Sequence, residues 1–362
     1  MRVAFSAFYC DSTGFGEASR RYLDAFRAVD DEIDLSRGVV LSDGGWVIQP
    51  DPWLNAFLKA DPSGPADLHL IQCAAADLDK VRPEFMEAPR VGMTCWETDR
   101  LHASSLEGCR SVDHVIVPST HNAEVLMAAG IRATVVPFPV VIPPSYSDEL
   151  PCPDLEDLDR DTFLFTSIMT WQERKNPVGL IAAYCSAFTK DDNVELAIKV
   201  SGGDPEAAIR AAKQVTEAVL QTMALRDAPR IRLIKGRWTN SMLWAFHARS
   251  DCYVSLARGE AFGIPLMDAA AMGNRVICTG YGGQRDFLPE ITTRWVQYRM
   301  MPVLQRYVHF DGRQRWADPD VLHAAELMRA EYQHGRQAKV LSDLSAFSPR
   351  SVGKRLQEAL LI

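Results

Sequence analysis

The sequence has no apolar run approaching the roughly 18 residues that a helix needs to span a bilayer. It also lacks a Cys-x-x-Cys pair and the Cys/His spacing of zinc sites, so its eight cysteines predict neither a metal framework nor a set of disulfides. Several cysteines lie inside apolar stretches, where a thiol packs as a small hydrophobic group. We therefore expect a protein of the reducing cytoplasm.

The chain also has no excess of positive charge. Residues 1–150 contain 12 basic and 22 acidic residues, a net charge of −10, and the other 27 basic and 25 acidic residues give +2, so the total is −8. An acidic first half argues against broad electrostatic binding to nucleic acid or to anionic lipid. We expect no stable association with either partner, and the oligomeric state stays open.

The composition is that of a globular protein, with 47% hydrophobic and 24% charged residues, and the chain is long enough for two domains. Short apolar segments alternate with amphipathic helical ones, which predicts an α/β fold with two doubly wound parallel sheets. The expected strands are 2–8, 67–72, 90–95, 114–117 and 134–137, then 162–168, 195–200, 230–234, 251–256 and 275–279. The expected helices are 17–29, 52–59, 101–109 and 121–129, then 177–188, 205–225, 240–248 and 265–272, with a helical tail over 319–331 and 351–361.

A stretch rich in proline and acidic residues separates the two halves. Because proline fixes the backbone and removes an amide donor, this stretch is predicted to be a linker without regular structure. The expected organisation is a first domain over 1–145, a linker over 146–160, a second domain over 161–340 and a C-terminal helix over 341–362.

The most informative segment is Arg258-Gly259-Glu260-Ala261-Phe262-Gly263-Ile264-Pro265-Leu266-Met267-Asp268. It leads from an apolar strand through a glycine turn into a helix. The amide groups at such a helix start, together with the helix dipole, favour a phosphate or diphosphate. Glu260 and Asp268 flank the turn and suit the hydroxyl groups of a sugar and a ribose. The segment therefore predicts a nucleotide-sugar site.

Basic residues follow the first strand of the second domain in the run Trp171-Gln172-Glu173-Arg174-Lys175-Asn176-Pro177. Asn176 suits a helix cap and Pro177 suits the first helical turn. Arg174 and Lys175 thus stand at the carboxyl edge of the sheet, where the fork of an arginine and the compact charge of a lysine can bind a diphosphate. Two solvated basic residues in a loop are the alternative.

Three further loops are candidates. Gly14 and Gly16 follow the first strand and allow close approach of a ligand, although a purely structural turn uses glycine too, and the full dinucleotide fingerprint is absent. Arg237 and Trp238 follow a strand of the second domain and could contact a base or pack in the core. Glu97 ends a strand of the first domain, where it is a candidate for binding acceptor hydroxyls or an ordinary exposed acid.

These motifs resemble those of the retaining family 4 glycosyltransferases, which have the GT-B fold. The likeness lies in two carboxylates around a Phe-Gly-x-Pro core, in the Arg-Lys-Asn-Pro run, and in the Ala-Ala-Ala-Met-Gly-Asn-Arg-Val-Ile that follows. One departure is visible, because the second acid is Asp268 where the family has Glu. The likeness covers most of residues 160–335 with specific motifs and the first 140 residues only loosely.

The resemblance implies a role for each candidate. Glu260, Arg174 and Lys175 would be catalytic, at the sugar and at the diphosphate. The implied donor-binding residues are Asp268, Gly14, Gly16, Phe262, Gly263, Arg237 and Trp238, and Glu97 would bind the acceptor. The resemblance also implies that the last helix crosses back to the first domain and that the anomeric configuration is retained. Neither Asp157/Asp159 nor Asp318/Asp320 follows a predicted strand as a metal-binding Asp-x-Asp does, so neither a metal ion nor another cofactor is expected.

The predicted function is transfer of a sugar from a nucleotide-sugar donor to a hydroxyl acceptor such as a glycan, a lipid-linked sugar or a small molecule. One alternative is a nucleotide-sugar-binding protein without turnover, which the shorter Asp268 favours. Another is a glycosyltransferase acting on DNA or protein. A sugar-nucleotide epimerase or a phosphorylase of the same two-domain build is a third possibility.

Overall fold

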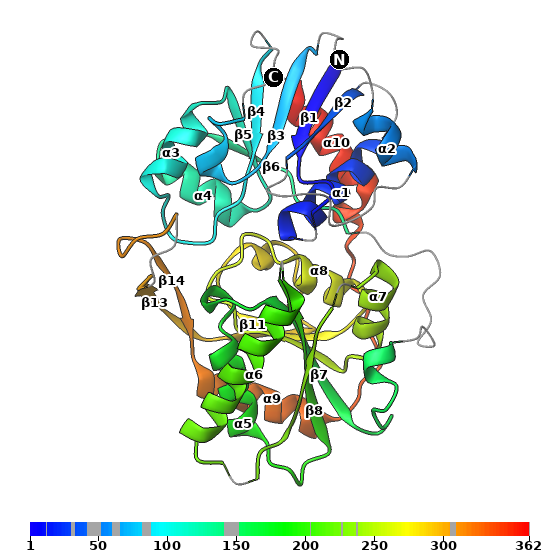
Figure 1. The fold of residues 1–362 in the computed structure, drawn as a ribbon, viewed down its shortest axis with the longest axis vertical. Coiled ribbons are helices and arrows are strands. Elements are labelled where there is room, and N and C mark those ends of the chain that lie inside the picture. Colours follow the sequence, from blue (N-terminus) through cyan, green and yellow to red (C-terminus); the bar gives the residue numbers. More distant parts are fainter. Residues whose placement is uncertain are drawn as a thin grey trace. The chain divides into compact units, whose positions relative to one another are not determined.

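The computed structural model of the chain describes residues 1–11, 13–29, 33–41, 52–59, 66–81, 88–140, 152–202, 204–225, 227–236, 238–304 and 309–361. The chain forms two compact units (Figure 1). Unit 1 comprises Met1–Val141, Pro302–Trp316 and Leu344–Ile362, and unit 2 comprises Ile142–Met301 and Ala317–Asp343. Residues 302–316, which the sequence assigned to the second domain, thus belong to unit 1.

Unit 1 is built on a six-stranded parallel sheet. The strand order is β2 (Asp34–Val40), β1 (Arg2–Ala7), β3 (Leu68–Gln72), β4 (Arg90–Met93), β5 (His114–Val117) and β6 (Ala133–Val135). The chain runs from β1 outward to β2 and then returns to the other side of β1, which is the doubly wound pattern. The edge strand β2 was not predicted, since none of its residues is fully buried and its apolar pattern is weak.

The helices of unit 1 are α1 (Gly14–Arg27), α2 (Pro52–Leu58), α3 (Ala103–Arg110), α4 (Thr120–Ala128) and α10 (Pro349–Leu360). The C-terminal helix α10 packs on α1 (Figure 1). A side chain on Gly353 of α10 would stand 2.3 Å from the carbonyl oxygen of Ala25, so the two helices touch along their backbones. The predicted return of the last helix to the first domain is therefore confirmed.

Unit 2 contains a second parallel sheet with its own doubly wound order. The order is β12 (Thr293–Val296), β11 (Arg275–Thr279), β10 (Cys252–Ser255), β7 (Phe163–Thr170), β8 (Val194–Ser201) and β9 (Arg230–Ile234). The chain starts at β7, moves to β9, and returns to the other side of β7 through β10. The winding direction thus reverses between β7 and β10. In such sheets, ligands bind beyond the carboxyl ends of the strands at this reversal.

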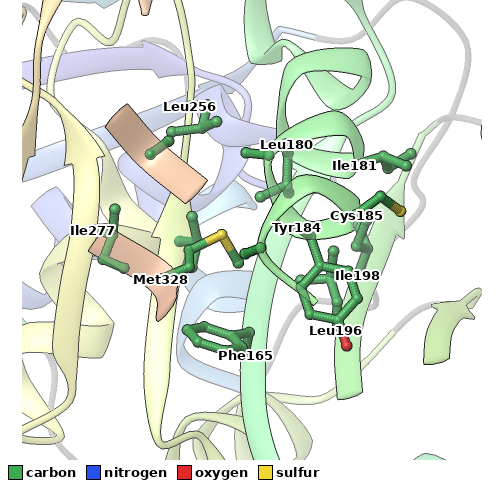
Figure 2. Packing of buried hydrophobic residues seen from close by; sticks show 14 of the residues in the cluster. Phe165, Leu180, Ile181, Tyr184, Cys185, Leu196, Ile198, Leu256, Ile277 and Met328 are labelled. Carbon is green, nitrogen blue, oxygen red and sulfur yellow. The ribbon is translucent and has the colours of Figure 1, made fainter. Parts of the chain in front are cut away.

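Helices cover both faces of the second sheet. They are α5 (Pro177–Ala187), α6 (Pro205–Thr222), α7 (Asn240–Arg249), α8 (Ile264–Ala271) and α9 (Val321–His334). Figure 2 shows one face, where Tyr184 of α5 and Met328 of α9 pack with Phe165 of β7. The adjacent residue of β7, Leu164, belongs to a second cluster with Phe246 of α7. Burial on both faces explains why β7 does not alternate apolar and polar residues, as is typical of a parallel strand inside a sheet.

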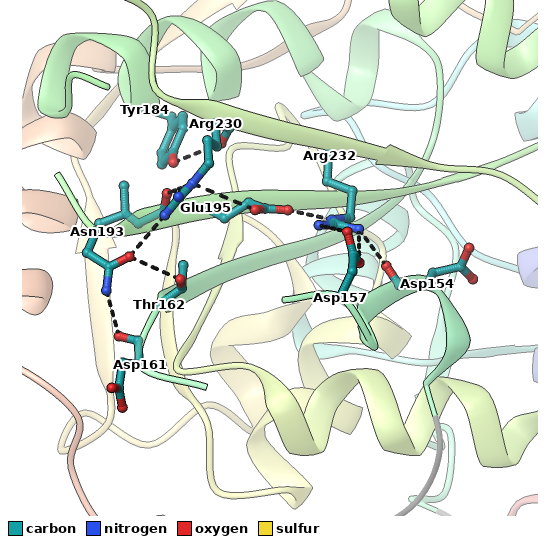
Figure 3. Close-up of polar contacts among 10 residues, drawn as sticks. Asp154, Asp157, Asp161, Thr162, Tyr184, Asn193, Glu195, Arg230 and Arg232 are labelled. Carbon is teal, nitrogen blue, oxygen red and sulfur yellow. Dashed lines mark hydrogen bonds and ion pairs between the residues drawn. The ribbon is translucent and has the colours of Figure 1, made fainter. Parts of the chain in front are cut away.

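The acidic half of the predicted linker, residues 152–160, belongs to unit 2. A short 3₁₀ helix, Pro153–Leu155, places Leu155 and Leu158 in the cluster with Phe246. Arg232 of β9 holds this segment by donating to both carboxylate oxygens of Asp157 at 2.7 and 3.2 Å (Figure 3). The same guanidinium donates to Glu195 of β8 at 2.5 Å. The rest of the predicted linker, residues 146–151, lies outside the described residues.

Two short strands, β13 (Tyr298–Pro302) and β14 (Arg315–Pro319), pair with each other and with no further strand in the described part of the chain, and neither was predicted. The chain between them belongs to unit 1, where the ring of Phe310 lies 5.4 Å from that of Trp96. Arg315 donates its backbone amide and its Nε to the carboxylate of Asp99, at 2.7 and 3.0 Å. A segment from late in the sequence is thereby fixed on the loop that follows β4.

Candidate functional site

Two loops of unit 2 meet at the point where the winding of its sheet reverses. One follows β7 and carries the 3₁₀ turn Glu173–Lys175; the other follows β10 and leads into α8. The backbone amide of Arg258 donates to the carbonyl oxygen of Arg174 at 2.7 Å, so the two loops are joined directly. The predicted diphosphate residues and the predicted sugar carboxylate therefore lie side by side.

The loop after β7 is shaped by Asn176. Its backbone is in the left-handed region, with φ +52°, and its side chain accepts from the amide of Gly179 to cap α5. Asn tolerates this conformation better than most residues. The chain thus turns sharply between the sheet and α5, and this turn presents Arg174 and Lys175 at the carboxyl edge.

Glu260 joins the two cations. Lys175 Nζ lies 2.5 Å from Glu260 Oε1, and Arg174 Nη1 lies 3.6 Å from Glu260 Oε2. Arg174 also donates to the carbonyl oxygen of Gly259 at 2.6 Å. Burial acts to raise the pKa of Glu260, but Lys175 and Arg174 outweigh it and lower that pKa below its usual value. The site therefore holds an ionised, mostly buried carboxylate between two positive charges.

The turn into α8 depends on Gly263. Its φ of +97° is a conformation that other residues rarely adopt, and α8 begins at the next residue with Pro265 in its first turn. The start of α8 places the positive end of the helix dipole beside the loop that carries Glu260. Such a helix start favours an anion, as the sequence predicted.

Asp268 is buried in the second turn of α8. Burial raises the pKa of Tyr253 on β10, and the negative charges of Glu260 and Asp268 raise it further. Both carboxylates of the predicted motif thus act electrostatically on the hydroxyl of Tyr253.

A third loop, after β11, packs against Glu260. The amide of Gly283 donates to the carbonyl oxygen of Glu260 at 2.8 Å. A side chain on Gly282 would stand 2.6 Å from that oxygen, and its φ of +114° also requires glycine. Gln284 holds the loop by donating to the carbonyl oxygens of Thr279 and Tyr281 at 2.9 and 2.8 Å. The glycines of this loop therefore allow its backbone to pack closely on the backbone of Glu260.

Two predicted donor-binding aromatics pack against other aromatic rings of unit 2. Phe262 is 2% exposed and stacks at an angle on Phe287, with 4.8 Å between ring centres. Trp238 packs on Phe246 at 5.1 Å and donates its Nε1 to Asp154 at 3.2 Å. The sequence left open whether Trp238 contacts a base or packs in the core, and in the structure its ring packs on Phe246. Its neighbour Arg237 lies outside the described residues.

The remaining predicted residues belong to unit 1. A side chain on Gly16 would stand 2.0 Å from the carbonyl oxygen of Asp11, whereas Gly14 has open space around it. Gly16 is thus needed because the start of α1 packs directly against the loop that follows β1. Glu97 is half-buried after β4. The cluster described above is made by unit 2 residues alone.

Sequence reasoning missed two charged residues at this edge. Arg258 bonds to the turn that carries Arg174 and Lys175. It is the first residue of the motif, two positions before Glu260, and this place in the motif was the available signal for it. Lys199 lies near the end of β8 and donates to the carbonyl oxygen of Gly236 at 2.7 Å, and its burial lowers its pKa to about 8. A lysine inside the apolar run Leu196–Val200 was the available signal for it.

The described residues contain neither a membrane-spanning helix nor a cluster of metal ligands. None of the helices they form is long and apolar enough to cross a bilayer. No group of three or more His, Cys, Asp or Glu residues among them is arranged to hold a metal ion.

Two six-stranded parallel α/β units, the second with its charged cluster at the reversal of the sheet, define the GT-B fold of glycosyltransferases. Residues 155–297, less than half of the chain, match the family model described as glycosyl transferases group 1. The predicted fold class, the family resemblance and the enzyme class are confirmed. A comparison with curated proteins found no match.

Solved structures agree on the fold. The crystal structure of Anabaena Alr3699/HepE in complex with UDP and glucose matches with a TM-score of 0.64 at 13% identity, covering 100% of this chain and 99% of that one. Sucrose-phosphate synthase from Thermosynechococcus elongatus matches with 0.62 at 15%, covering 100% and 94%. The α,α-trehalose 6-phosphate synthase from Burkholderia multivorans matches with 0.57 at 9%, covering 81% and 70%. Identities this low establish the fold alone.

Proposed function

We propose that the protein is a retaining, metal-independent glycosyltransferase of family 4 that moves a sugar from a nucleoside diphosphate sugar to a hydroxyl acceptor. The observation that carries this proposal is the meeting of Lys175, Arg174 and Glu260 at the reversal of the second sheet, beside the start of α8. Similar folds have been solved with UDP or UDP-glucose bound, which makes a uridine diphosphate sugar the first donor to test.

In this proposal the two cations and the start of α8 bind the diphosphate. Glu260 contacts hydroxyl groups of the sugar, and Asp268 contacts the ribose. Breaking the bond to the anomeric carbon places negative charge on the leaving diphosphate. Fixed donors aimed at that charge stabilise the transition state, by roughly 3 kcal/mol for one well-placed donor.

The state of Glu260 supports same-face attack over a covalent intermediate. Its carboxylate is already engaged by Lys175 and Arg174, which weakens it as a nucleophile. The acceptor oxygen would attack from the face that the diphosphate leaves, and a diphosphate oxygen would take the acceptor proton. Retention at the anomeric carbon follows from that geometry.

The positive charge available at the site supports metal independence, because two cations and a helix dipole supply the charge that a divalent ion would provide. The eight cysteines are free thiols, which supports a cytoplasmic location. The acceptor is a glycan, a lipid-linked sugar or a small molecule in this proposal. The acidic net charge makes nucleic acid an unfavourable acceptor.

The proposal is tested by offering UDP-, GDP-, ADP- and dTDP-sugars with EDTA present, and by measuring melting shifts and nucleoside diphosphate release with cell extract as acceptor. We expect one donor to stabilise the protein and to be consumed, with a labelled product by mass spectrometry. Stabilisation without release would instead identify a binding protein without turnover. Activity that EDTA abolishes would contradict metal independence.

A matched pair of variants tests the site. Lys175→Ala should weaken nucleoside diphosphate binding about tenfold or more, because one charge-assisted contact is lost. Lys235→Ala removes an exposed lysine that makes a similar ion pair, with Glu206 at 2.6 Å, and should leave binding unchanged. Equal dissociation constants for Lys175→Ala and the unaltered protein would reject the diphosphate assignment.

A further inference from the structure

Arg258 makes contacts that no part of the proposed chemistry uses. Its side chain is mostly buried, and its Nη1 donates to Glu173 twice, to the carboxylate Oε1 at 3.1 Å and to the backbone carbonyl at 3.3 Å. Its Nη2 lies 3.6 Å from a carboxylate oxygen of Asp318 on β14. One guanidinium thus links the turn after β7 to a strand distant in the sequence.

The backbone of Arg258 makes a second set of links between the same segments. Its amide donates to the carbonyl oxygen of Arg174 at 2.7 Å, and its carbonyl accepts from the amide of Ala317 at 2.8 Å. Arg258 is therefore bonded to the first two residues of the Glu173–Lys175 turn. It also lies in the same loop as Glu260, two positions before it.

These contacts fix the orientation of the turn. Glu173, Arg174 and Lys175 form a single 3₁₀ turn, so holding one residue by its carbonyl and its carboxylate restrains the direction of the other two. A planar guanidinium that binds several oxygens at once restrains rotation, which a lysine at the same place cannot do.

We propose that Arg258 is a positioning residue that holds the Glu173–Lys175 turn through Glu173, with Asp318 on its other side, so that Arg174 and Lys175 face the diphosphate of the donor. This inference rests on the proposed function. It also means that Glu173, although negatively charged, favours the binding of an anion because it holds the turn in place. Arg258 itself touches neither the donor nor the reacting atoms.

The direction in which Glu173→Ala changes the affinity for UDP distinguishes positioning of the turn from a simple effect of charge. Glu173→Ala removes a negative charge beside the anion site, so charge alone predicts tighter binding of UDP. Positioning predicts the opposite, a loss of about tenfold, because the turn is no longer held. Arg258→Lys keeps the charge and loses the planar fork, and it should weaken binding by a similar factor.

Arg299→Gln is the matched control. Arg299 bonds to the same Asp318 at 3.2 Å, but its side chain is 84% exposed and it makes no contact with the turn in the described structure. Its removal should leave UDP affinity unchanged. Calorimetric titration of the four proteins, together with their melting temperatures, separates altered binding from misfolding. Tighter binding by Glu173→Ala, or full affinity in Arg258→Lys, would overturn the inference.

A second measurement needs no nucleotide. Acetylation of Lys175 by acetic anhydride, followed by mass spectrometry, reports how firmly its amine is paired with Glu260. We expect Lys175 to be modified several-fold faster in Arg258→Gln and in Glu173→Ala than in Arg299→Gln or the unaltered protein. If no nucleotide binds but this pattern is found, the proposed function fails and positioning stands. Equal rates in all four proteins would refute positioning.

Discussion

The ion pair between Lys175 and Glu260 has a consequence for how a ligand enters. At 2.5 Å, with side chains 17% and 11% exposed, the amine and the carboxylate satisfy each other before any donor arrives. Under the proposed function, a diphosphate would draw Lys175 and Arg174 toward itself, and a sugar hydroxyl would replace them at Glu260. Donor binding would then be an exchange of partners, in which the diphosphate pairs with the two cations and the sugar pairs with the carboxylate.

The exchange predicts opposite effects of Glu260→Gln on stability and on nucleotide affinity. Removing the carboxylate leaves two mostly buried cations without their shared partner, so the free energy of unfolding should fall by about 1–3 kcal/mol. The same cations are then available to a diphosphate, and UDP should bind at least as tightly as before. Sugar transfer should fall by about a hundredfold or more, because Glu260 no longer holds the sugar hydroxyls.

Urea unfolding, calorimetric titration with UDP and initial rates measure the three quantities. Glu206→Gln is the control, since Glu206 makes a Lys–Glu pair of similar length that is more than half exposed. A Glu260→Gln protein that loses UDP binding and transfer to the same extent would show that Glu260 serves the nucleotide and not the sugar.

At the scale of elements, most of unit 2 could be predicted. Strands β9 and β11 were predicted with their observed bounds, because each is a short β-branched run between turn residues. The cap at Asn176 and the start of α8 were predicted from local chemistry. The contact of Lys175 with Glu260 joins residues 85 apart. Only the family resemblance brought them together in advance.

What could not be predicted depends on tertiary context. Strands β13 and β14 pair only with each other, and their sequences contain too few alternating apolar residues to signal a strand. Arg258 was overlooked as a separate residue because the role proposed for it depends on its bonds to Glu173 and Asp318, and neither spacing nor residue type reveals these bonds. Phe262 matched the motif, yet its side chain belongs to the core.

The start of α1 gives a prediction with an internal control, because two glycines stand two positions apart in different surroundings. Gly16→Ala places a methyl group 2.0 Å from the carbonyl oxygen of Asp11, so it should lower the free energy of unfolding by about 2–4 kcal/mol. Gly14→Ala meets no atom of the described residues within 4 Å and should be neutral or slightly stabilising. Chemical denaturation compares the two. Equal losses would mean that the helix start, and not the close contact, requires glycine.

Glu17 in the first turn of α1 should make stability depend on pH. Burial acts to raise the pKa of Glu17, but Arg21 and Arg20, at 2.8 and 3.0 Å, outweigh it and lower that pKa to about 2. Its folded pKa is thus below the ordinary value of 4.5, so its contribution is complete above pH 4.5 and is lost as the pH falls toward 2. That contribution is roughly 1–3 kcal/mol after allowance for solvent screening.

Urea unfolding at pH 6, 4 and 3 tests this. Glu17→Gln should be less stable than the unaltered protein at pH 6, and the difference should shrink as the pH falls. Glu358→Gln, at an exposed position of α10, should follow the unaltered protein throughout. A constant difference at all three pH values would show that Glu17 acts through packing and not through its charge.

At the scale of the whole molecule, neither unit is a continuous stretch of chain. The chain passes between the units four times, after residues 141, 301, 316 and 343. The sequence suggested a single linker and one returning helix, because proline and charge mark only the first of these passages. Unit 1 is complete only with α10 from the end of the chain, so a fragment ending at the predicted boundary lacks part of its own core.

The last helix should therefore control the stability of the first unit. Leu356 of α10 is fully buried, and Leu356→Ala should cost about 2–5 kcal/mol. Leu361, five positions later and 62% exposed, is the control, and Leu361→Ala should change little. Hydrogen exchange followed by mass spectrometry locates the effect: amides of β1, β3 and β4 should lose protection in Leu356→Ala, while those of β7, β10 and β11 keep theirs. Equal loss in both sheets would mean that the two units unfold as one, and protection unchanged in β1 would mean that α10 is not part of the core of unit 1.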